Sequence, residues 1–227
     1  MKTNILICGA TGFIGRNFLE SFSKIINYKI YATYNKKKKT NIKNVKWIKA
    51  DLTTYKDCLK ATKNKDIILQ FAAMTSGSNV ILAQPYLHIT DNAVMNSYIL
   101  KASYHNKIKH FIFTSCTVMY PNSKKALKET ELEEDKIHQS YFGAAHTKLY
   151  IEKMCNFFSK ISSTRFTIIR HSNIYGPHDK FDIKTGHFIS SSFKKILNRG
   201  SEIEVFGSGE EKRDYLYITD LINFVKK

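Results

Sequence analysis

This sequence has few cysteines and no long apolar segment, and each shortage argues against a class of protein. The four cysteines, at positions 8, 58, 116 and 155, form no C-x-x-C pair and no metal-ligand spacing. We therefore expect no metal site and a reduced, cytoplasmic chain. No apolar run reaches the roughly 20 residues that cross a bilayer. The apolar stretch Ile5–Cys8 runs directly into glycines, so we expect a buried strand there, with no signal peptide and no membrane partner.

Acidic residues are also scarce. The chain has 36 Lys and Arg against 19 Asp and Glu, a formal net charge of +17. Such an excess can attract nucleic acid, an anionic membrane or an anionic small molecule. Apart from the run at 36–39, the lysines are scattered, and neither an aromatic RNA-binding strand nor a zinc finger accompanies them. A nucleic-acid role would rest on charge alone, so we expect a solvated basic surface and no nucleic-acid partner.

The apolar pattern predicts strands that alternate with helices. Strands are expected at 3–8, 28–34, 45–50, 67–71, 108–114, 166–170 and 203–206. Helices are expected from Ile14 onward, at 57–62, 85–104, 140–161 and 188–197, and from Leu221, with a polar loop at 122–139. Alternation of this kind predicts right-handed βαβ units and a parallel sheet. Because the chain stops a few residues into its last predicted helix, we expect the C-terminal lobe to be truncated.

A glycine triplet lies between the first predicted strand and helix. The segment "ILICGATGFIGRNFLE" contains Gly9, Gly12 and Gly15. In that context the first glycine allows a tight turn, the second lets the backbone approach a pyrophosphate, and the third lets the helix pack on the strand. The helix N-terminus adds N–H donors and a positive dipole end. The alternative is a glycine-rich turn without a ligand.

The loop and the alternation together predict the fold class: α/β, a Rossmann doubly wound parallel sheet with a small, truncated C-terminal substrate lobe. We expect a dinucleotide-binding domain at 1–170. A partial substrate-binding lobe, interleaved with the last sheet elements, is expected at 171–227.

The cofactor preference follows from a missing carboxylate. An NAD site places an acid on the ribose 2′-hydroxyl about 20 residues past the glycines. This region reads Tyr34-Asn35-Lys36-Lys37 and contains no acid. Two cations would suit a 2′-phosphate, so NADP(H) is favoured and NAD(H) stays possible. The alternative is that Lys36 and Lys37 belong to a solvated loop.

Several motifs occur in a familiar order: "GATGFIG", then "DL" at 51–52, "FAAMTSG", Asn92, "FTSCTVMYP", "TKLYIEK", "IRHSNIYGPHDKF" and "RDYLYITDL". Over nearly its whole length the chain thus resembles the extended short-chain dehydrogenase/reductases, the NAD-dependent epimerase/dehydratases that act on nucleotide sugars. "MYP" and "NIYGPHDKF" are most similar to the GDP-L-fucose synthase group. The resemblance implies an NADP(H)-dependent epimerase, dehydratase or reductase for a nucleotide sugar, with a GDP-sugar favoured, and a homodimer.

The resemblance also assigns roles to individual residues. Those implied to contact the cofactor are Gly9, Thr11, Gly12, Phe13, Ile14, Gly15, Asp51, Leu52, Phe71, Ala72, Ala73, Lys148, His171 and Ile174. Those implied to face the sugar nucleotide are Asn173, His187 and Arg213. The guanidinium of Arg213 would bind the diphosphate, a pairing that its planar fork suits. The alternative is a surface ion pair with Glu210 or Asp214.

The family's catalytic Ser/Thr, Tyr and Lys are only partly present. "TKLYIEK" gives Lys148, but the tyrosine position is Ala144. Tyr141, three residues earlier, is a candidate replacement, with a packed aromatic as the alternative. The Ser/Thr position falls on Cys116, which could instead be a buried strand-end thiol, while Thr117 would restore a hydroxyl after a one-residue shift.

His178 is the last catalytic candidate. In "YGPHD" the resemblance makes it an acid/base for epimerisation, a task that suits an imidazole. The family's partner cysteine corresponds to Val118. Two interpretations stay open: an enzyme slowed by Ala144, or a non-catalytic module that binds dinucleotide and nucleotide sugar, and could regulate an active homologue.

Overall fold

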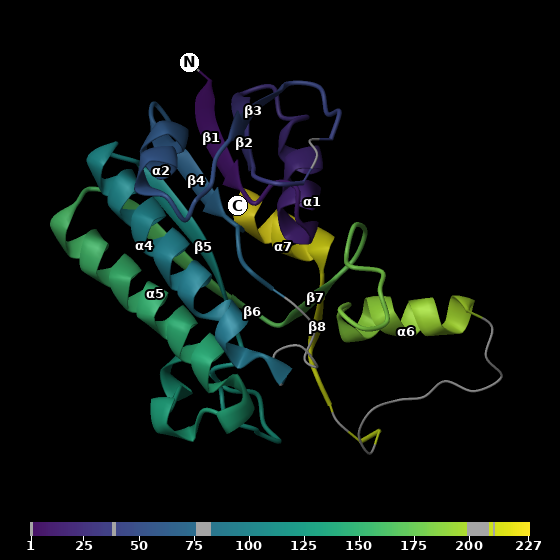
Figure 1. Ribbon diagram of the computed structural model, residues 1–227. Coiled ribbons are helices and arrows are strands. Elements are labelled where there is room, and N and C mark those ends of the chain that lie inside the picture. Colours follow the sequence, from purple (N-terminus) through teal and green to yellow (C-terminus); the bar gives the residue numbers. More distant parts are fainter. Residues whose placement is uncertain (1, 38–39, 76–82, 199–208, 211) are drawn as a thin grey trace.

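The computed structural model describes all residues except 1, 38–39, 76–82, 199–208 and 211. Its centre is a six-stranded sheet with the order β3-β2-β1-β4-β5-β6 (Figure 1). Every neighbouring pair is parallel. The strands are β1 (Thr3–Cys8), β2 (Tyr28–Tyr34), β3 (Val45–Lys49), β4 (Ile67–Gln70), β5 (His110–Cys116) and β6 (Arg165–His171). The strand order runs outward in opposite directions from β1 and β4, which is the switch point of a Rossmann sheet, so the predicted fold class is confirmed.

Helices cover both faces of this sheet (Figure 1). On one face, buried side chains of α2 (Tyr55–Thr62), α4 (Thr90–His105) and α5 (Phe142–Ile161) form one apolar cluster with the sheet. On the other face, α1 (Phe13–Phe22) and α7 (Ile218–Lys226) form a second cluster. This layering satisfies the requirement that a parallel sheet be buried on both sides.

A smaller unit follows β6. The strands β7 (Asn173–Tyr175) and β8 (Tyr215–Tyr217) pair in parallel as a two-stranded sheet. The helix α6 (Phe188–Leu197) projects from the body of the molecule (Figure 1). The division of the chain into domains at 170/171 stays a prediction.

The sequence pattern located most elements and missed the shortest ones. The ranges predicted for β2 and α6 agree with the structure at both ends. The helix predicted at 85–104 is divided into a 3-10 turn, η1 (Pro85–His88), and α4. The predicted loop at 122–139 holds the short turns η2 (Glu129–Glu131) and η3 (Glu134–Lys136), and η4 (Gln139–Tyr141) begins at its end. The strand predicted at 203–206 lies outside the described residues.

Candidate functional site

The phosphate loop joins β1 to α1 and leaves no room for side chains at two of its glycines. Gly9 has φ +70°, and a Cβ there would stand 2.7 Å from the backbone of Ala72. A Cβ on Gly15 would collide with the carbonyl oxygen of Gly9. A Cβ on Gly12 would meet only that same oxygen, at 3.3 Å. Space therefore remains beside Gly12, where the backbone of such a loop receives a pyrophosphate.

The first turn of α1 supplies the donors for this site. Gly12 lies immediately before the helix, and its N–H donates to the Gly9 carbonyl at 2.9 Å. The first N–H groups of a helix have no acceptor within it, so they can donate to an anion that lies beyond the helix N-terminus. Thr11, Phe13 and Ile14 are half-buried around this turn. The loop residues present thus fit a dinucleotide.

The end of β2 lies beside the end of β3. Lys36 and Lys37 are exposed just after β2. Asp51 follows β3, and its Oδ1 accepts hydrogen bonds from the backbone N–H (3.0 Å) and hydroxyl (2.6 Å) of Thr53. These bonds hold the pKa of Asp51 below its usual value, and the charge of Lys36 adds to the effect. Leu52 is buried. Asp51 is therefore a fixed anion beside Lys36, at the expected adenine end of the site.

The segment after β4 is held by Asn92 of α4. The Asn92 Oδ1 accepts from the Met74 N–H at 2.8 Å, and its Nδ2 donates to the Met74 carbonyl at 3.0 Å. In the same segment the backbone of Ala72 lies beside Gly9 of the phosphate loop, and the ring of Phe71 packs on Phe18 of α1. The sequence indicated Asn92 only as a motif residue and did not predict that it holds this segment. An Asn at a core position of a helix could have indicated a buried hydrogen-bonding role.

Lys148 reaches from α5 to the carboxyl end of β5. Its Nζ donates to the Thr114 carbonyl at 2.8 Å and lies 4.7 Å from the ring centre of Phe113. Burial lowers the pKa of Lys148. The thiol of Cys116 is close enough that the two groups perturb each other, although burial keeps the pKa of Cys116 above its usual value. Cys116 therefore lies near Lys148, and its role at the Ser/Thr position stays a prediction. Thr117 instead lines a cavity of about 260 Å³ with Tyr120.

His171 lies opposite Cys116 in the β5–β6 register. Its Nδ1 is 2.8 Å from the carbonyl oxygen of Ser172, so this nitrogen carries the proton that it donates. Burial lowers the pKa of His171 to about 4, with smaller contributions from the charges of Lys148 and His187. The imidazole is therefore neutral at pH 7. Ile174 of β7, the other residue expected near the nicotinamide, is buried.

Ala144, at the tyrosine position of the motif, and Tyr141, the candidate replacement, are differently placed relative to Lys148. Ala144 is half-buried one turn before Lys148 on α5, about 40° from it around the helix. Tyr141 precedes α5, and its ring centre is 6.1 Å from that of His138 in the preceding loop. Ala144 therefore shares the face of Lys148, whereas Tyr141 packs beside the loop.

The loop after β7 carries two of the remaining histidines. His178 has φ +69°, and its Nε2 lies 3.1 Å from a carboxylate oxygen of Glu20 on α1. His187 Nδ1 lies 2.9 Å from Oδ1 of Asp179, whose side chain is 4% exposed. The structure thus brings His178 against α1, and it gives His187 an acidic partner that the sequence did not indicate.

Asn173 and Arg213 belong to the β7–β8 unit. Asn173 is exposed on β7, and its Nδ2 donates to the Asp214 carbonyl at 3.2 Å. Arg213 is exposed just before β8. Asn173 and Arg213, two of the three residues predicted to face a sugar nucleotide, therefore lie at the surface.

An ion pair missed by sequence reasoning joins α5 to β6. Arg170 donates through Nη2 to Oε2 of Glu152 at 2.7 Å, and through Nη1 to the Tyr120 hydroxyl at 2.7 Å. The side chains of Arg170 and Glu152 are 20% and 7% exposed. This pair fixes α5, and with it Lys148, against the end of the sheet.

Membrane spans and metal clusters are both absent from the described part of the chain. None of the helices there is long and apolar enough to span a bilayer. Nor do three or more His, Cys, Asp or Glu side chains gather in a way that could hold a metal ion among those residues.

Relatives with known names match this sequence. The chain is 28% identical to GDP-L-colitose synthase of Yersinia pseudotuberculosis, a match that covers 97% of this chain and 70% of that protein. It is 24% identical to GDP-L-fucose synthase of Escherichia coli K12, over 71% of this chain and 52% of that protein. The matched region thus covers 70% of the length of the colitose synthase and 52% of the length of the fucose synthase.

Solved structures share the fold. A UDP-N-acetylglucosamine 4-epimerase from Methanobrevibacter ruminantium M1, in complex with UDP-N-acetylmuramic acid, has TM-score 0.84 and 26% identity, covering 98% of this chain and 72% of that one. A GDP-L-fucose synthetase from Naegleria fowleri bound to NADP has TM-score 0.76 and 24% identity, over 98% and 71%.

A protein-family model matches nearly the whole chain. The model of the NAD dependent epimerase/dehydratase family matches residues 5–227. The match includes the phosphate loop, the Lys148 helix and the β7–β8 unit, and it confirms the family and the enzyme class that the motif order predicted. The chain therefore belongs to the NAD-dependent epimerase/dehydratase family, whose members are nicotinamide-dinucleotide enzymes of nucleotide sugars.

Proposed function

We propose that this chain binds NADP(H) and acts on a GDP-sugar as an epimerase/reductase. The observation that carries the proposal is the placement of the glycine cradle and of Lys148 at the carboxyl ends of strands in one sheet. Ligands bind at that edge of an open α/β sheet, at the switch point. The names of GDP-L-colitose synthase and GDP-L-fucose synthase among the relatives favour guanosine as the base.

Each residue has a task in this proposal. The phosphate loop binds the pyrophosphate, Asp51 and Leu52 contact the adenine, and Lys148 holds the nicotinamide ribose. The cofactor, when bound, supplies or accepts a hydride. Cys116 lies where the substrate oxygen is oriented, and a thiol is a weaker hydrogen-bond donor than a hydroxyl. Arg213 binds the sugar-nucleotide diphosphate.

Other parts of the proposal concern proton transfer and assembly. His178 and Tyr141 are the titratable candidates for moving a proton, and Thr117 is the hydroxyl next to Cys116. The chain acts in the cytoplasm as a homodimer. Exposed aromatic side chains on α4 and α5 support the dimer: Tyr104, Tyr150 and Phe157.

A thermal-unfolding assay tests the substrate class. A GDP-sugar at about 100 times its Kd should stabilise the protein by about 2.7 kcal/mol, which raises Tm by about 5–10 °C for a chain of this size. The variant Arg213→Ala should lose this shift and keep the shift given by NADPH. If neither GDP nor any nucleotide sugar in a panel moves Tm at millimolar concentration, the substrate proposal is wrong.

The cofactor preference has its own test. Lys36→Ala combined with Lys37→Ala should weaken NADPH binding about 10- to 100-fold, because two cations that pair with a 2′-phosphate are lost. NADH, which lacks that phosphate, should change less than about twofold. Calorimetry measures both affinities. Lys56→Ala with Lys60→Ala removes the same charge from exposed positions on α2 and serves as the control. Equal losses for NADPH and NADH would contradict the preference.

A second candidate function is supported by Ala144. Without a phenol one turn before Lys148, the chain would hold dinucleotide and nucleotide sugar without turnover, as a binding module or as a regulatory partner of an active homologue. Binding of both ligands with no product in a long incubation would favour this alternative.

A further inference from the structure

The loop between β7 and α6 holds a lysine against the segment that follows β4. Lys180 Nζ donates to the carbonyl oxygen of Thr75 at 2.6 Å. Thr75 belongs to the segment after β4 that also holds Ala72 and Ala73. Burial lowers the pKa of Lys180, and the nearby charge of Lys37, which follows β2, lowers it further, whereas the charges of Asp179 and Asp182 act in the opposite direction. The ammonium therefore lies against the segment that follows β4 and near Lys37, which follows β2.

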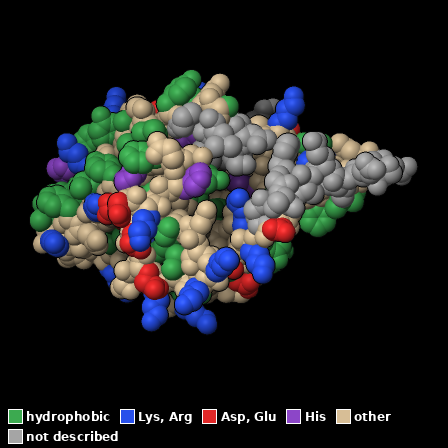
Figure 2. Space-filling model, turned by 90° about the horizontal axis from the view of Figure 1, so that it is seen from below, with side chains coloured by type: hydrophobic (Ala, Val, Ile, Leu, Met, Phe, Trp, Pro, Cys, Tyr) green, Lys and Arg blue, Asp and Glu red, His purple; other side chains and the backbone are tan. Residues whose placement is uncertain are grey.

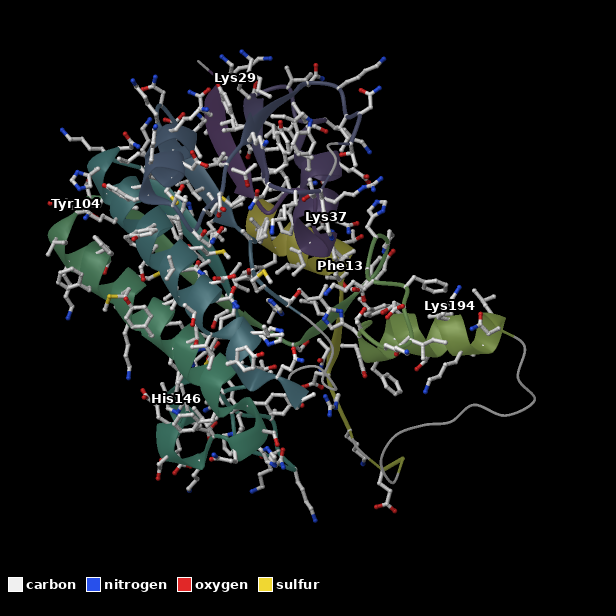
Figure 3. All side chains as sticks on the ribbon, in the orientation of Figure 1. Phe13, Lys29, Lys37, Tyr104, His146 and Lys194 are labelled. Carbon is white, nitrogen blue, oxygen red and sulfur yellow. The ribbon has the colours of Figure 1, made fainter. Side chains whose placement is uncertain are left out.

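The strand order shows which part of the sheet lies near Lys180. β2 and β4 are the two neighbours of β1 in the sheet. The segments that follow β2 and β4 therefore flank the carboxyl end of β1, where the phosphate loop begins. Figure 2 views the molecule from this side, and lysine, arginine and histidine side chains are spread over the face. Figure 3 shows Lys37 and Phe13 near the same end of α1 as the loop after β7.

Two contacts fix the loop against α1. Asn17 Nδ2 donates to the Pro177 carbonyl at 2.7 Å and to the Phe13 carbonyl at 3.0 Å. His178 Nε2 lies 3.2 Å from Glu20 Oε2. The loop therefore runs beside the helix whose N-terminus would receive the pyrophosphate. Lys180 is two residues past His178 in this loop, and it contacts the Thr75 carbonyl.

Two carboxylates near Lys180 are partly engaged with other groups, while Oδ2 of Asp179 is buried with no hydrogen-bond partner in the described structure. Asp182 Oδ1 accepts from the backbone N–H and hydroxyl of Thr185, at 2.7 and 2.8 Å. Asp179 Oδ1 is 2.7 Å from the backbone N–H of Lys180 and 2.9 Å from Nδ1 of His187. Within the described ranges, no carboxylate forms an ion pair with Lys180 Nζ. The ammonium has one carbonyl partner and two further donors for an anion.

We propose that Lys180 binds the pyrophosphate of the dinucleotide, on the side of the phosphate loop away from the sheet. An ammonium binds phosphate oxygens as a point charge. This role differs from the one proposed for Lys36 and Lys37, which is to bind the 2′-phosphate. It rests on the proposed dinucleotide function. It makes the loop after β7 part of the cofactor site as well as of the substrate lobe.

The test compares ligands that share or lack the pyrophosphate. Lys180→Met should weaken NADPH, NADH and ADP-ribose by a similar factor of about tenfold, the effect of losing one charge-assisted contact. AMP, which has no pyrophosphate, should bind as before. Lys184→Met removes an exposed charge from the same loop and should leave all four affinities unchanged. Lys180→Arg keeps the charge and should retain most of the affinity. Calorimetry measures binding without requiring turnover.

Each other outcome overturns a defined part of the proposal. If Lys180→Met binds NADPH, NADH and ADP-ribose normally while the Lys36 and Lys37 variant still loses NADPH, Lys180 has no role and the proposed function stands. If the loss is confined to NADPH, Lys180 reads the 2′-phosphate and the pyrophosphate assignment is wrong. If the unchanged protein binds no dinucleotide, the proposed function fails and this inference fails with it. A low affinity of both Lys180→Arg and Lys180→Met, with lowered Tm for both, would show a purely structural role.

Discussion

Ala144→Tyr is expected to raise the rate of hydride transfer by about 10²- to 10⁴-fold, the usual contribution of a positioned general acid. Position 144 lies one turn before Lys148 on α5, about 40° away around the helix. A phenol at that position would point to the same side as the Lys148 ammonium. The positive charge would lower the pKa of the phenol towards neutral pH and prepare it to exchange a proton with the sugar oxygen. Stopped-flow fluorescence of NADPH with a GDP-sugar measures the rate.

Two control variants decide what the gain means. Ala144→Phe adds the ring without the hydroxyl and should give no increase. Tyr141→Phe should leave the rate of the unchanged protein as it was. If the unchanged protein already turns over at an ordinary enzyme rate, and Tyr141→Phe abolishes that rate, Tyr141 is the working acid. If Ala144→Tyr lowers Tm without a gain in rate, Ala144 lies in a packed contact and the binding-module alternative is favoured.

Glu152→Ala is expected to lower the free energy of unfolding by about 3–5 kcal/mol, because it leaves the Arg170 guanidinium largely buried without its carboxylate. Urea denaturation followed by circular dichroism measures the change. Glu152→Gln, which keeps the shape and one acceptor oxygen, should cost less than Glu152→Ala.

The adjacent residue provides a matched control. Lys153 pairs with Glu134 at 2.8 Å, but the two side chains are 60% and 45% exposed. Exposed pairs of this kind contribute about 0–1 kcal/mol, so Lys153→Ala should change stability little. An equal, small effect of Glu152→Ala and Lys153→Ala would show that the Arg170–Glu152 pair does not hold α5 against the sheet.

Local signals in the sequence predicted the sheet and its helices. Tyr28–Tyr34 combines β-branched and aromatic residues, and α6 repeats its apolar positions with helical spacing, so both were located correctly. The strands β7 and β8 have three residues each, which is too short for an alternating pattern to stand out. They form because each supplies the other with backbone partners, and that pairing spans about 40 residues of chain.

The candidate site likewise contains residues that the sequence predicted and contacts that it did not. The phosphate loop and Lys148 are recognisable because their chemistry needs a fixed local spacing. The partners of His178 and Arg170 were not predictable, since Glu20 is 158 positions from His178 and Glu152 is 18 positions from Arg170. Such pairs depend on how α1 and α5 pack, which no local pattern describes. Lys180 gave no signal at all, because a lone lysine in a basic chain is indistinguishable from a surface residue.

The projecting helix α6 implies an uneven distribution of stability. Four of its apolar side chains, Phe188, Phe193, Ile196 and Leu197, are more than half exposed to water. A helix of 10 residues gains little from its own hydrogen bonds and normally depends on packing. Within the described structure, α6 should therefore unfold locally at a lower free energy than the sheet. His187 immediately precedes this helix, so the segment to which the proposed function assigns the sugar nucleotide should open more readily than the sheet.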